Sequence, residues 1–280
     1  KNFSYYLNEE EQFVIDNYNR AQPFSSFLPA IAGIHGKPLW AYYVNRGQCI
    51  ATMGINDKTH QIMEFFPANA AFRQTPLQGF RTFLKIKNRT TGSECCYEPL
   101  QSSSGRQYDI KQKMYITSYD IRLEEVNETL GVKTEVMFCT LPGEAVGSLV
   151  RKVSVTNISG EDLEIEMLDG LPIIIPYCTT EINFKGGGFS LQAFMNVYNH
   201  ETIPYYKIDM VPLDQPEMFE VEGGYFYLNF DFGDGGKPNL SRVIVETEKV
   251  FGSITDNTYP ENFFEAGFSF PQSQINKGKL

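Results

Sequence analysis

Residues 21–55 read AQPFSSFLPAIAGIHGKPLWAYYVNRGQCIATMGI and contain the single tryptophan of the chain, Trp40. Their second half predicts two antiparallel strands, Pro38–Val44 and Gln48–Ile55, joined by the turn Asn45-Arg46-Gly47. Gly47 suits this turn because glycine adopts positive φ angles without strain. The first half contains two prolines and two glycines, and is therefore predicted to form neither a long helix nor a long strand.

The same stretch is rich in flat apolar rings and poor in charge. Such rings stack on the C–H face of a sugar, while the amide of Asn45 and the guanidinium of Arg46 are suited to its hydroxyl groups. We therefore interpret the stretch as a candidate sugar-binding edge, although burial in the core is the commoner role for any single ring. The aromatic residues beside Trp40 are Phe24, Phe27, Tyr42 and Tyr43.

The remainder of the chain has the pattern of an all-β protein. The whole chain is 14% aromatic, with 22 Phe and 16 Tyr, a composition that suits strands around a large core. Many short strand patterns without a dividing linker predict one domain over residues 1–280, a large antiparallel β-sandwich. The first is predicted at Phe13–Ile15, and later ones at Ile62–Phe66, Ala71–Leu77, Phe80–Lys87, Glu94–Pro99, Val132–Phe138, Phe219–Val221, Tyr225–Phe232 and Arg242–Val250.

Two further elements are predicted from clear local patterns. Leu149–Val155 and Leu163–Met167 alternate in polarity around the turn Asn157–Gly160, which predicts a hairpin. Ser190–Asn199 is the one predicted helix, with Ser190 as its N-cap. Its apolar face is predicted to comprise Leu191, Phe194, Met195 and Tyr198.

Charge and cysteine content narrow the possible partners. The formal net charge is −10, which argues against a nucleic-acid partner because phosphate binding requires a basic face. The longest apolar run, Leu171–Pro176, is far too short to span a bilayer. The five cysteines include no Cys-x-x-Cys pair and are odd in number, so we expect free thiols and a cytoplasmic location. Because residue 1 is Lys and residues 276–280 form a polar tail, we expect both ends to be cut points in a longer protein.

Catalytic motifs are sparse. The three histidines, His35, His60 and His200, lack metal-binding spacing, and no Gly-x-Ser-x-Gly occurs. The glycine run after Lys185 is predicted to be a flexible loop before the helix rather than a phosphate site. Asp169, beside an apolar run, comes closest to a carboxylate in an apolar setting, and a position at a strand end or turn is the commoner role.

Four strings stand out in the first 85 residues: YNRAQPFSSFLP at 18–29, PLWAYYVNRGQ at 38–48, EFFPAN at 64–69 and GFRTF at 79–83. They resemble the N-terminal domain of 1,2-β-oligoglucan phosphorylases, members of the cellobiose-phosphorylase-like family of inverting glycoside phosphorylases. The segment Leu149–Met167 also looks like a strand, Asn-x-Ser turn and strand of that family.

The resemblance implies a non-catalytic β-supersandwich similar to the galactose-mutarotase fold. In such enzymes a helical linker and an (α/α)6 barrel follow, and the barrel holds the general-acid Asp and the site for inorganic phosphate, the co-substrate. The N-terminal domain helps to form a homodimer and lines the cleft for the β-linked glucose oligosaccharide. By analogy, the candidates for sugar or interface contact are Phe24, Phe27, Trp40, Asn45, Arg46, Gln48, Asn69 and Arg81, with no catalytic, cofactor or metal residue in this segment.

Two alternatives remain open from the sequence. One is a self-sufficient mutarotase-like enzyme that uses His35 or His60 with a carboxylate such as Glu64 as acid and base. The other is a carbohydrate-binding or assembly module without catalysis.

Overall fold

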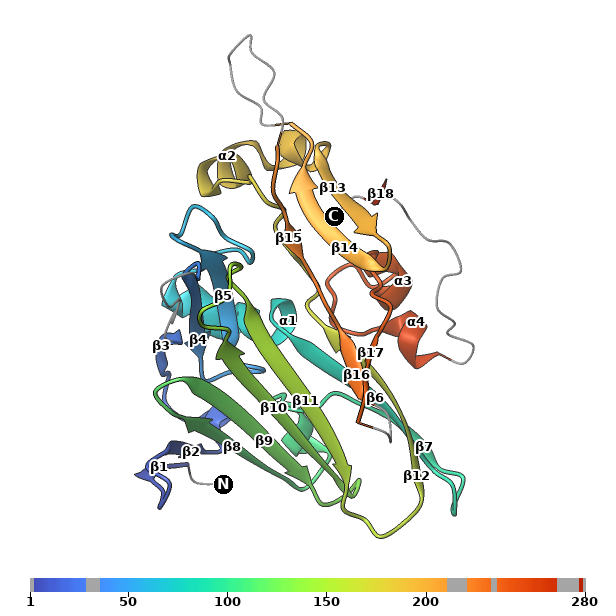
Figure 1. Cartoon of the computed structure of the whole chain (residues 1–280). Coiled ribbons are helices and arrows are strands. Elements are labelled where there is room, and N and C mark those ends of the chain that lie inside the picture. Colours follow the sequence, from blue (N-terminus) through green and yellow to red (C-terminus); the bar gives the residue numbers. More distant parts are fainter. Residues whose placement is uncertain (1–2, 29–35, 211–220, 233–235, 266–276, 279–280) are drawn as a thin grey trace. The chain divides into compact units, whose positions relative to one another are not determined.

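The computed structural model of the chain describes residues 3–28, 36–210, 221–232, 236–265 and 277–278 (Figure 1). Most of the regular structure is antiparallel β-sheet, which confirms the predicted all-β class. The chain divides into two compact units, residues 1–56 with 65–172 and residues 57–64 with 173–280. The prediction of a single domain stays a prediction. Among the described residues no helix is long and apolar enough to cross a membrane.

The first unit contains a six-stranded sheet with the order β1-β2-β8-β9-β10-β11. β1 precedes the strand that the sequence predicts as the first. On β9 alternate residues from Ile121 to Asn127 are buried, as expected for a sheet with one face in the core. The strands are Ser4–Leu7 (β1), Phe13–Asp16 (β2), Ile110–Ile116 (β8), Asp120–Asn127 (β9), Val132–Thr140 (β10) and Leu149–Asn157 (β11).

A three-stranded sheet, β12-β6-β7, supplies the opposing layer of this core. Leu84 and Ile86 of β6 and Tyr97 of β7 pack in one cluster with Val132 of β10. Residues of the two sheets therefore share one hydrophobic cluster, as in a sandwich. The strands are Leu163–Gly170 (β12), Arg81–Asn88 (β6) and Glu94–Tyr97 (β7).

The predicted hairpin of β11 and β12 is wrong in its pairing. β11 pairs with β10, while β12 pairs with β6 in the other sheet. The turn between them is nevertheless ordered by its own side chains, because Asn157 Oδ1 accepts from Ser159 N at 2.9 Å and Gly160 has a φ of +75°. The polarity alternation that predicts a hairpin also fits a chain crossing between two layers.

The third sheet of this unit contains the quoted stretch and has the order β3-β4-β5. It comprises Ser25–Leu28 (β3), Leu39–Val44 (β4) and Ile50–Ile55 (β5). The predicted strand pair is confirmed, but residues 45–49 form the connecting loop. Gly47 has the expected positive φ, +53°, and a Cβ there would lie 2.9 Å from Pro76 Cα. Helix α1, Ala68–Gln78, packs against β4 and β5.

Helix α1 corrects the strand predicted over Ala71–Leu77. The buried residues of this segment, Ala71 and Thr75, are four apart, the spacing of a helical face rather than a strand. Thr75 Oγ1 also donates to the backbone carbonyl of Ala71 at 2.7 Å. Ile62–Phe66, also predicted as a strand, lies outside any strand. Two single-turn 3-10 helices, Tyr18–Arg20 (η1) and Ser104–Arg106 (η2), complete the first unit.

The described part of the second unit contains a sheet with the order β15-β14-β13-β18, the separate hairpin β16-β17 and three helices. The predicted strand over Arg242–Val250 is wrong, because α3 occupies its second half. The predicted strand Phe219–Val221 lies mostly outside the described residues. The elements are Glu181–Gln192 (α2), Met195–His200 (β13), Ile203–Ile208 (β14), Tyr225–Phe226 (β15), Phe230–Phe232 (β16), Pro238–Leu240 (β17), Thr247–Phe251 (α3), Glu261–Phe264 (α4) and Lys277–Gly278 (β18).

The helix predicted at Ser190–Asn199 is displaced. α2 begins after Thr180, whose side chain accepts from Asn183 N at 3.2 Å, and it includes the glycine run predicted as a loop. Met195–His200 instead forms β13, because its residues pair with β14. Leu191 and Met195, predicted on one helical face, do share a buried cluster with Ile208.

Candidate functional site

Four aromatic rings form a continuous row on one face of the β3-β4-β5 sheet. Phe27 lies opposite Tyr42 in the strand register, with 5.1 Å between ring centroids. Phe65 continues the row, 6.4 Å from Tyr42 and 6.3 Å from Trp40. Trp40 and Tyr42 share this face because they are two residues apart on β4. We call Phe27, Tyr42, Phe65 and Trp40 the ring row.

The ring row is partly open to solvent. Phe27 is 56% exposed and Tyr42 is 9% exposed, while Trp40 and Phe65 are half-buried. Beyond Tyr42 the sheet is covered, because Ala71 of α1 packs on Tyr42 and Val44. The row therefore has one exposed end at Phe27, beside the buried ring of Tyr42, and a half-buried end at Trp40. The exposed ring of Phe27 suits stacking against an apolar face of a ligand.

Phe24 belongs to a second set of rings. Its centroid lies 6.2 Å from Tyr43 and 6.0 Å from Phe13, and Phe13 stacks on Tyr5 at 6.1 Å. Tyr43 alternates with Tyr42 along β4, so this set lies on the opposite face of the sheet from the ring row. The structure thus separates the two predicted phenylalanines, Phe24 and Phe27, instead of bringing them together.

The polar candidates of the loop are directed inward. Asn45 is fully buried, and its Nδ2 donates to the carbonyls of Tyr18 at 3.0 Å and Gln22 at 2.8 Å. Its Oδ1 accepts from Phe24 N at 2.8 Å. Both amide hydrogens are therefore occupied by backbone partners, and the side chain fastens residues 18–24 to the loop.

Arg46 has a similar structural role. Its Nη1 donates to the carbonyl of Asn45 at 2.6 Å and its Nη2 to that of Ala21 at 3.0 Å. The guanidinium also lies 5.6 Å from the ring centroid of Phe72. Burial lowers the pKa of Arg46 from its usual value, but an arginine stays charged at neutral pH. These contacts hold the loop that ends β4, next to the ring row.

Gln48 lies in a buried polar network that sequence reasoning did not assemble. Its Nε2 donates to Thr82 Oγ1 at 2.9 Å, and Thr82 Oγ1 donates to Asp169 Oδ1 at 2.6 Å. Arg151 of β11 donates to Asp169 and to Gln48, so it joins the six-stranded sheet to β6 and β12. We call Gln48, Thr82, Arg151 and Asp169 the arginine clasp.

The arginine clasp is well sheltered. The side chain of Arg151 is 7% exposed, and its guanidinium lies 5.2 Å from the ring centroid of Phe80 and 5.6 Å from that of Phe138. The sequence contains a signal for this network, because Arg151 shares one face of its strand with the apolar residues Leu149 and Val153. A charge in the apolar row of a strand indicates a buried partner.

The two remaining candidates lie outside the ring row. Arg81 is 2% exposed and forms a two-pronged ion pair with Glu98, Nε to Oε1 at 2.7 Å and Nη2 to Oε2 at 2.8 Å. Asn69 is exposed in the first turn of α1. Of the eight predicted contact residues, the structure thus brings only Phe27 and Trp40 into one row.

A second buried carboxylate, Glu125, was not found from the sequence. It is 1% exposed, and it accepts hydrogen bonds from Tyr97 Oη, Leu100 N and Gln112 Nε2, the last two at 2.9 and 2.6 Å. Burial raises the pKa of Glu125 above its usual value, and the hydrogen bonds oppose that shift. The signal was its place in the apolar register of β9, two residues after Leu123.

The histidines form no catalytic cluster in the described structure. His60 is exposed, and its Nδ1 lies 2.9 Å from Asp57 Oδ1, so the carboxylate beside this imidazole is that of Asp57. Hydrogen bonds from Thr59 and His60 hold the pKa of Asp57 at about 2. His200 is exposed, and His35 lies outside the described residues. Within the described ranges no group of three or more His, Cys, Asp or Glu residues could hold a metal ion.

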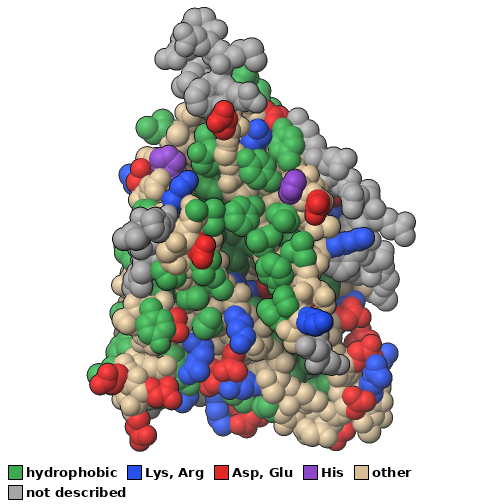
Figure 2. Space-filling view, in the orientation of Figure 1, with side chains coloured by type: hydrophobic (Ala, Val, Ile, Leu, Met, Phe, Trp, Pro, Cys, Tyr) green, Lys and Arg blue, Asp and Glu red, His purple; other side chains and the backbone are tan. Residues whose placement is uncertain are grey.

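All five cysteines are free thiols, as the sequence predicts. Charged side chains of both signs lie side by side over the lower part of the face in Figure 2. On β9 and β10, Lys133 Nζ lies 3.0 Å from Glu124 and 3.2 Å from Glu135.

Comparison with known proteins adds no assignment. No protein-family model matches the chain, and no curated protein matches it significantly.

Proposed function

We propose that this chain is the non-catalytic N-terminal sandwich domain of an inverting glycoside phosphorylase that acts on β-glucan oligosaccharides. The observation that carries the proposal is the ring row, whose Phe27 is 56% exposed at the end of a row anchored in the core. The resemblance of residues 18–29, 38–48, 64–69 and 79–83 to 1,2-β-oligoglucan phosphorylases supports it independently.

In this proposal the sandwich shapes the substrate cleft and the homodimer of the parent enzyme, while bond breaking occurs in a separate barrel. Phosphate would attack the anomeric carbon with inversion, and a general acid of that barrel would protonate the leaving oxygen. The isolated chain is then expected to bind oligosaccharide without turning it over.

In this proposal the predicted contact residues have two different roles. Phe27 presents an exposed ring that suits the C–H face of a glucose unit, and the half-buried Trp40 lies in the same row. Asn45, Arg46 and Gln48 act as positioning residues, because their polar groups are engaged by the protein itself. They fix the loop that follows β4, the strand that carries Trp40 and Tyr42.

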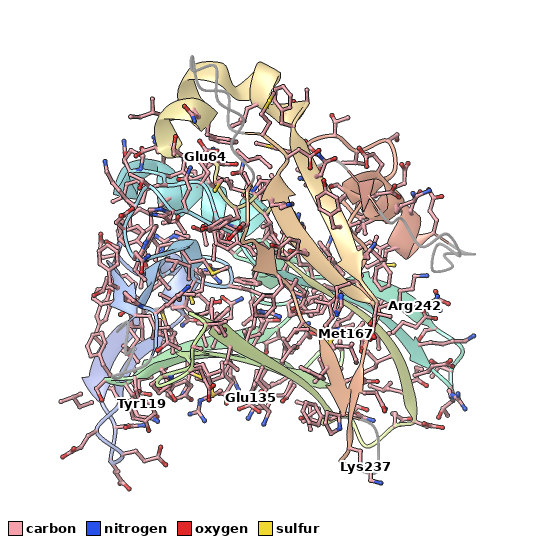
Figure 3. The ribbon with its side chains drawn as sticks, turned by 45° about the horizontal axis from the view of Figure 1, so that its top comes forward. Glu64, Tyr119, Glu135, Met167, Lys237 and Arg242 are labelled. Atoms are coloured by element: carbon pink, nitrogen blue, oxygen red, sulfur yellow. The ribbon has the colours of Figure 1, made fainter. Side chains whose placement is uncertain are left out.

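The direct test is calorimetric titration of the chain with a β-1,2-linked glucose oligosaccharide. We expect saturable binding that Phe27→Ala weakens about tenfold, equivalent to ~1.4 kcal/mol. Tyr119→Ala is the matched control, because Tyr119 is an aromatic residue that is 59% exposed on the turn between β8 and β9 (Figure 3) and is not a member of the ring row.

If Phe27→Ala and Tyr119→Ala bind the oligosaccharide with equal affinity, the ring row is not its binding site. The mutarotase-like alternative makes a different prediction. Interconversion of aldose anomers by the isolated chain, abolished by His60→Ala, would overturn the non-catalytic assignment.

A further inference from the structure

A depression lies in the first unit, between β7 and the 3-10 helix η2. It has a volume of about 280 Å³, just below the ~300–1,000 Å³ that is usual for pockets holding drug-sized ligands. A ligand of the size of a single sugar ring therefore suits it better than a larger one. Its lining is Cys96, Tyr97, Glu98, Gln101, Ser103, Ser104, Arg106, Gln107 and Tyr108. We call it the η2 pocket.

The apolar wall of the η2 pocket is a pair of tyrosine rings. Tyr97 and Tyr108 meet edge to face, with 5.2 Å between centroids and an interplanar angle of 83°. Tyr97 is 3% exposed, whereas Tyr108 is half-buried and lies nearer to solvent. Burial raises the pKa of Tyr108, so its hydroxyl stays protonated at neutral pH and can donate a hydrogen bond.

The acidic charge in the pocket is already neutralised. Glu98 accepts both prongs of Arg81, and Gln101 Nε2 donates to the same carboxylate at 2.9 Å. Arg106 and Gln107 are exposed at the rim and make no ion pair or side-chain hydrogen bond within the described part of the chain. The pocket thus offers amide and guanidinium donors without a strong field of one sign.

The wall behind the pocket is held by buried hydrogen bonds. Tyr97 Oη donates to Glu125, and Gln112 Nε2 donates both to Glu125 at 2.6 Å and to the carbonyl of Gln101 at 3.1 Å. Asn19 Nδ2 donates to Gln112 Oε1 at 3.1 Å, which connects this wall to η1. Side chains fixed in this way favour binding, because little conformational entropy is lost when a ligand arrives.

We propose that the η2 pocket binds a neutral polyhydroxylated ligand of the size of one pyranose ring, with Tyr108 against its C–H face and Gln107 and Arg106 on its hydroxyl groups. This site shares no lining residue with the ring row. It goes beyond the function proposed above and does not depend on it.

The test is a titration of the intact ¹⁵N-labelled chain with D-glucose, followed by two-dimensional NMR, with inorganic phosphate in a separate arm. We expect saturable shifts of the backbone amides of residues 101–108 with glucose and little response to phosphate. Tyr108→Ala and Gln107→Ala should each weaken the glucose response about tenfold, whereas the neighbour control Ser102→Ala should not. Gln107 is exposed, so its variant keeps the fold and the test stands even where Tyr108→Ala is destabilised.

The outcomes separate this inference from the proposed function. The proposal that the η2 pocket binds this ligand is overturned if glucose causes no shifts at residues 101–108. It is also overturned if both variants leave those shifts unchanged. Shifts with phosphate but not with glucose would make it an anion site and overturn the ligand class. Loss of the pocket response in Phe27→Ala would show one site instead of two, whereas a pocket response that survives in Phe27→Ala supports the inference whatever the ring row binds.

Discussion

The first unit exposes rings and buries charges. In the ring row Phe27 is 56% exposed, whereas in the arginine clasp the Arg151 side chain is 7% exposed and in the loop Asn45 is fully buried. Hydrophobicity alone would predict the opposite, with the ring of Phe27 buried and the side chains of Arg151 and Asn45 exposed. The difference indicates that the polar groups serve the fold, by satisfying backbone and strand-to-strand partners, whereas the ring of Phe27 is left open to solvent.

The largest expected effect is the loss of the arginine clasp. Arg151→Ala leaves Asp169 and Gln48 without their buried cationic partner, which should lower the free energy of unfolding by about 3–5 kcal/mol. Urea denaturation measures it. Arg89→Ala is the control, because Arg89 and Glu164 form an ion pair with side chains that are 59% and 47% exposed, and such pairs contribute ~0–1 kcal/mol. Equal costs for the two variants would contradict a structural role for the buried charges.

The next effect concerns the loop. Asn45→Ala removes three hydrogen bonds to backbone groups and should lower the free energy of unfolding by about 2–3 kcal/mol. Oligosaccharide affinity per folded molecule should fall less than in Phe27→Ala, because Asn45 positions the loop and its polar atoms are engaged by backbone partners. Asn69→Ala, at an exposed position, should stay within ~0.5 kcal/mol of the parent. If Asn45→Ala instead left stability intact and reduced affinity, Asn45 would be a contact residue rather than a positioning residue.

The smallest effect is a dependence on pH. Burial raises the pKa of Glu125 in the folded state, so between the unfolded value, about 4.3, and the higher folded value the native state binds more protons than the unfolded state. Stability from this group is therefore greatest below the unfolded pKa and declines as pH rises through that window. Glu125→Gln should remove that part of the decline, as measured by urea denaturation across pH. If the free energy of unfolding depends on pH in the same way in the parent and in Glu125→Gln, burial does not raise the pKa of Glu125.

Local patterns predicted part of this fold correctly. The strand pair of residues 38–55 and the positive φ of Gly47 follow from sequence, since hairpin chemistry is local. The partner of β12 does not, because pairing with β6 rather than β11 is decided by packing between layers. For the same reason β13 is a strand where helical spacing suggests a helix, since β14 supplies its hydrogen bonds.

The candidate site was predictable to a similar extent. The strand register places Phe27 beside Tyr42, so the ring row could be anticipated once the strand pairs were known. The inward direction of the Asn45 side chain could not be predicted, because its partners Tyr18 and Gln22 lie 27 and 23 residues away in the sequence. The register of β9 and β11 did carry signals for Glu125 and Arg151, in that each interrupts an apolar row.

The most direct test of the ring row uses the fact that Trp40 is the only tryptophan in the chain. Its fluorescence therefore reports on the ring row alone when the chain is titrated with a β-1,2-linked glucose oligosaccharide. The account predicts a saturable change in emission that follows calorimetric binding and is weakened about tenfold by Phe27→Ala. Emission that stays constant while calorimetry shows binding would contradict it, as would the absence of any binding.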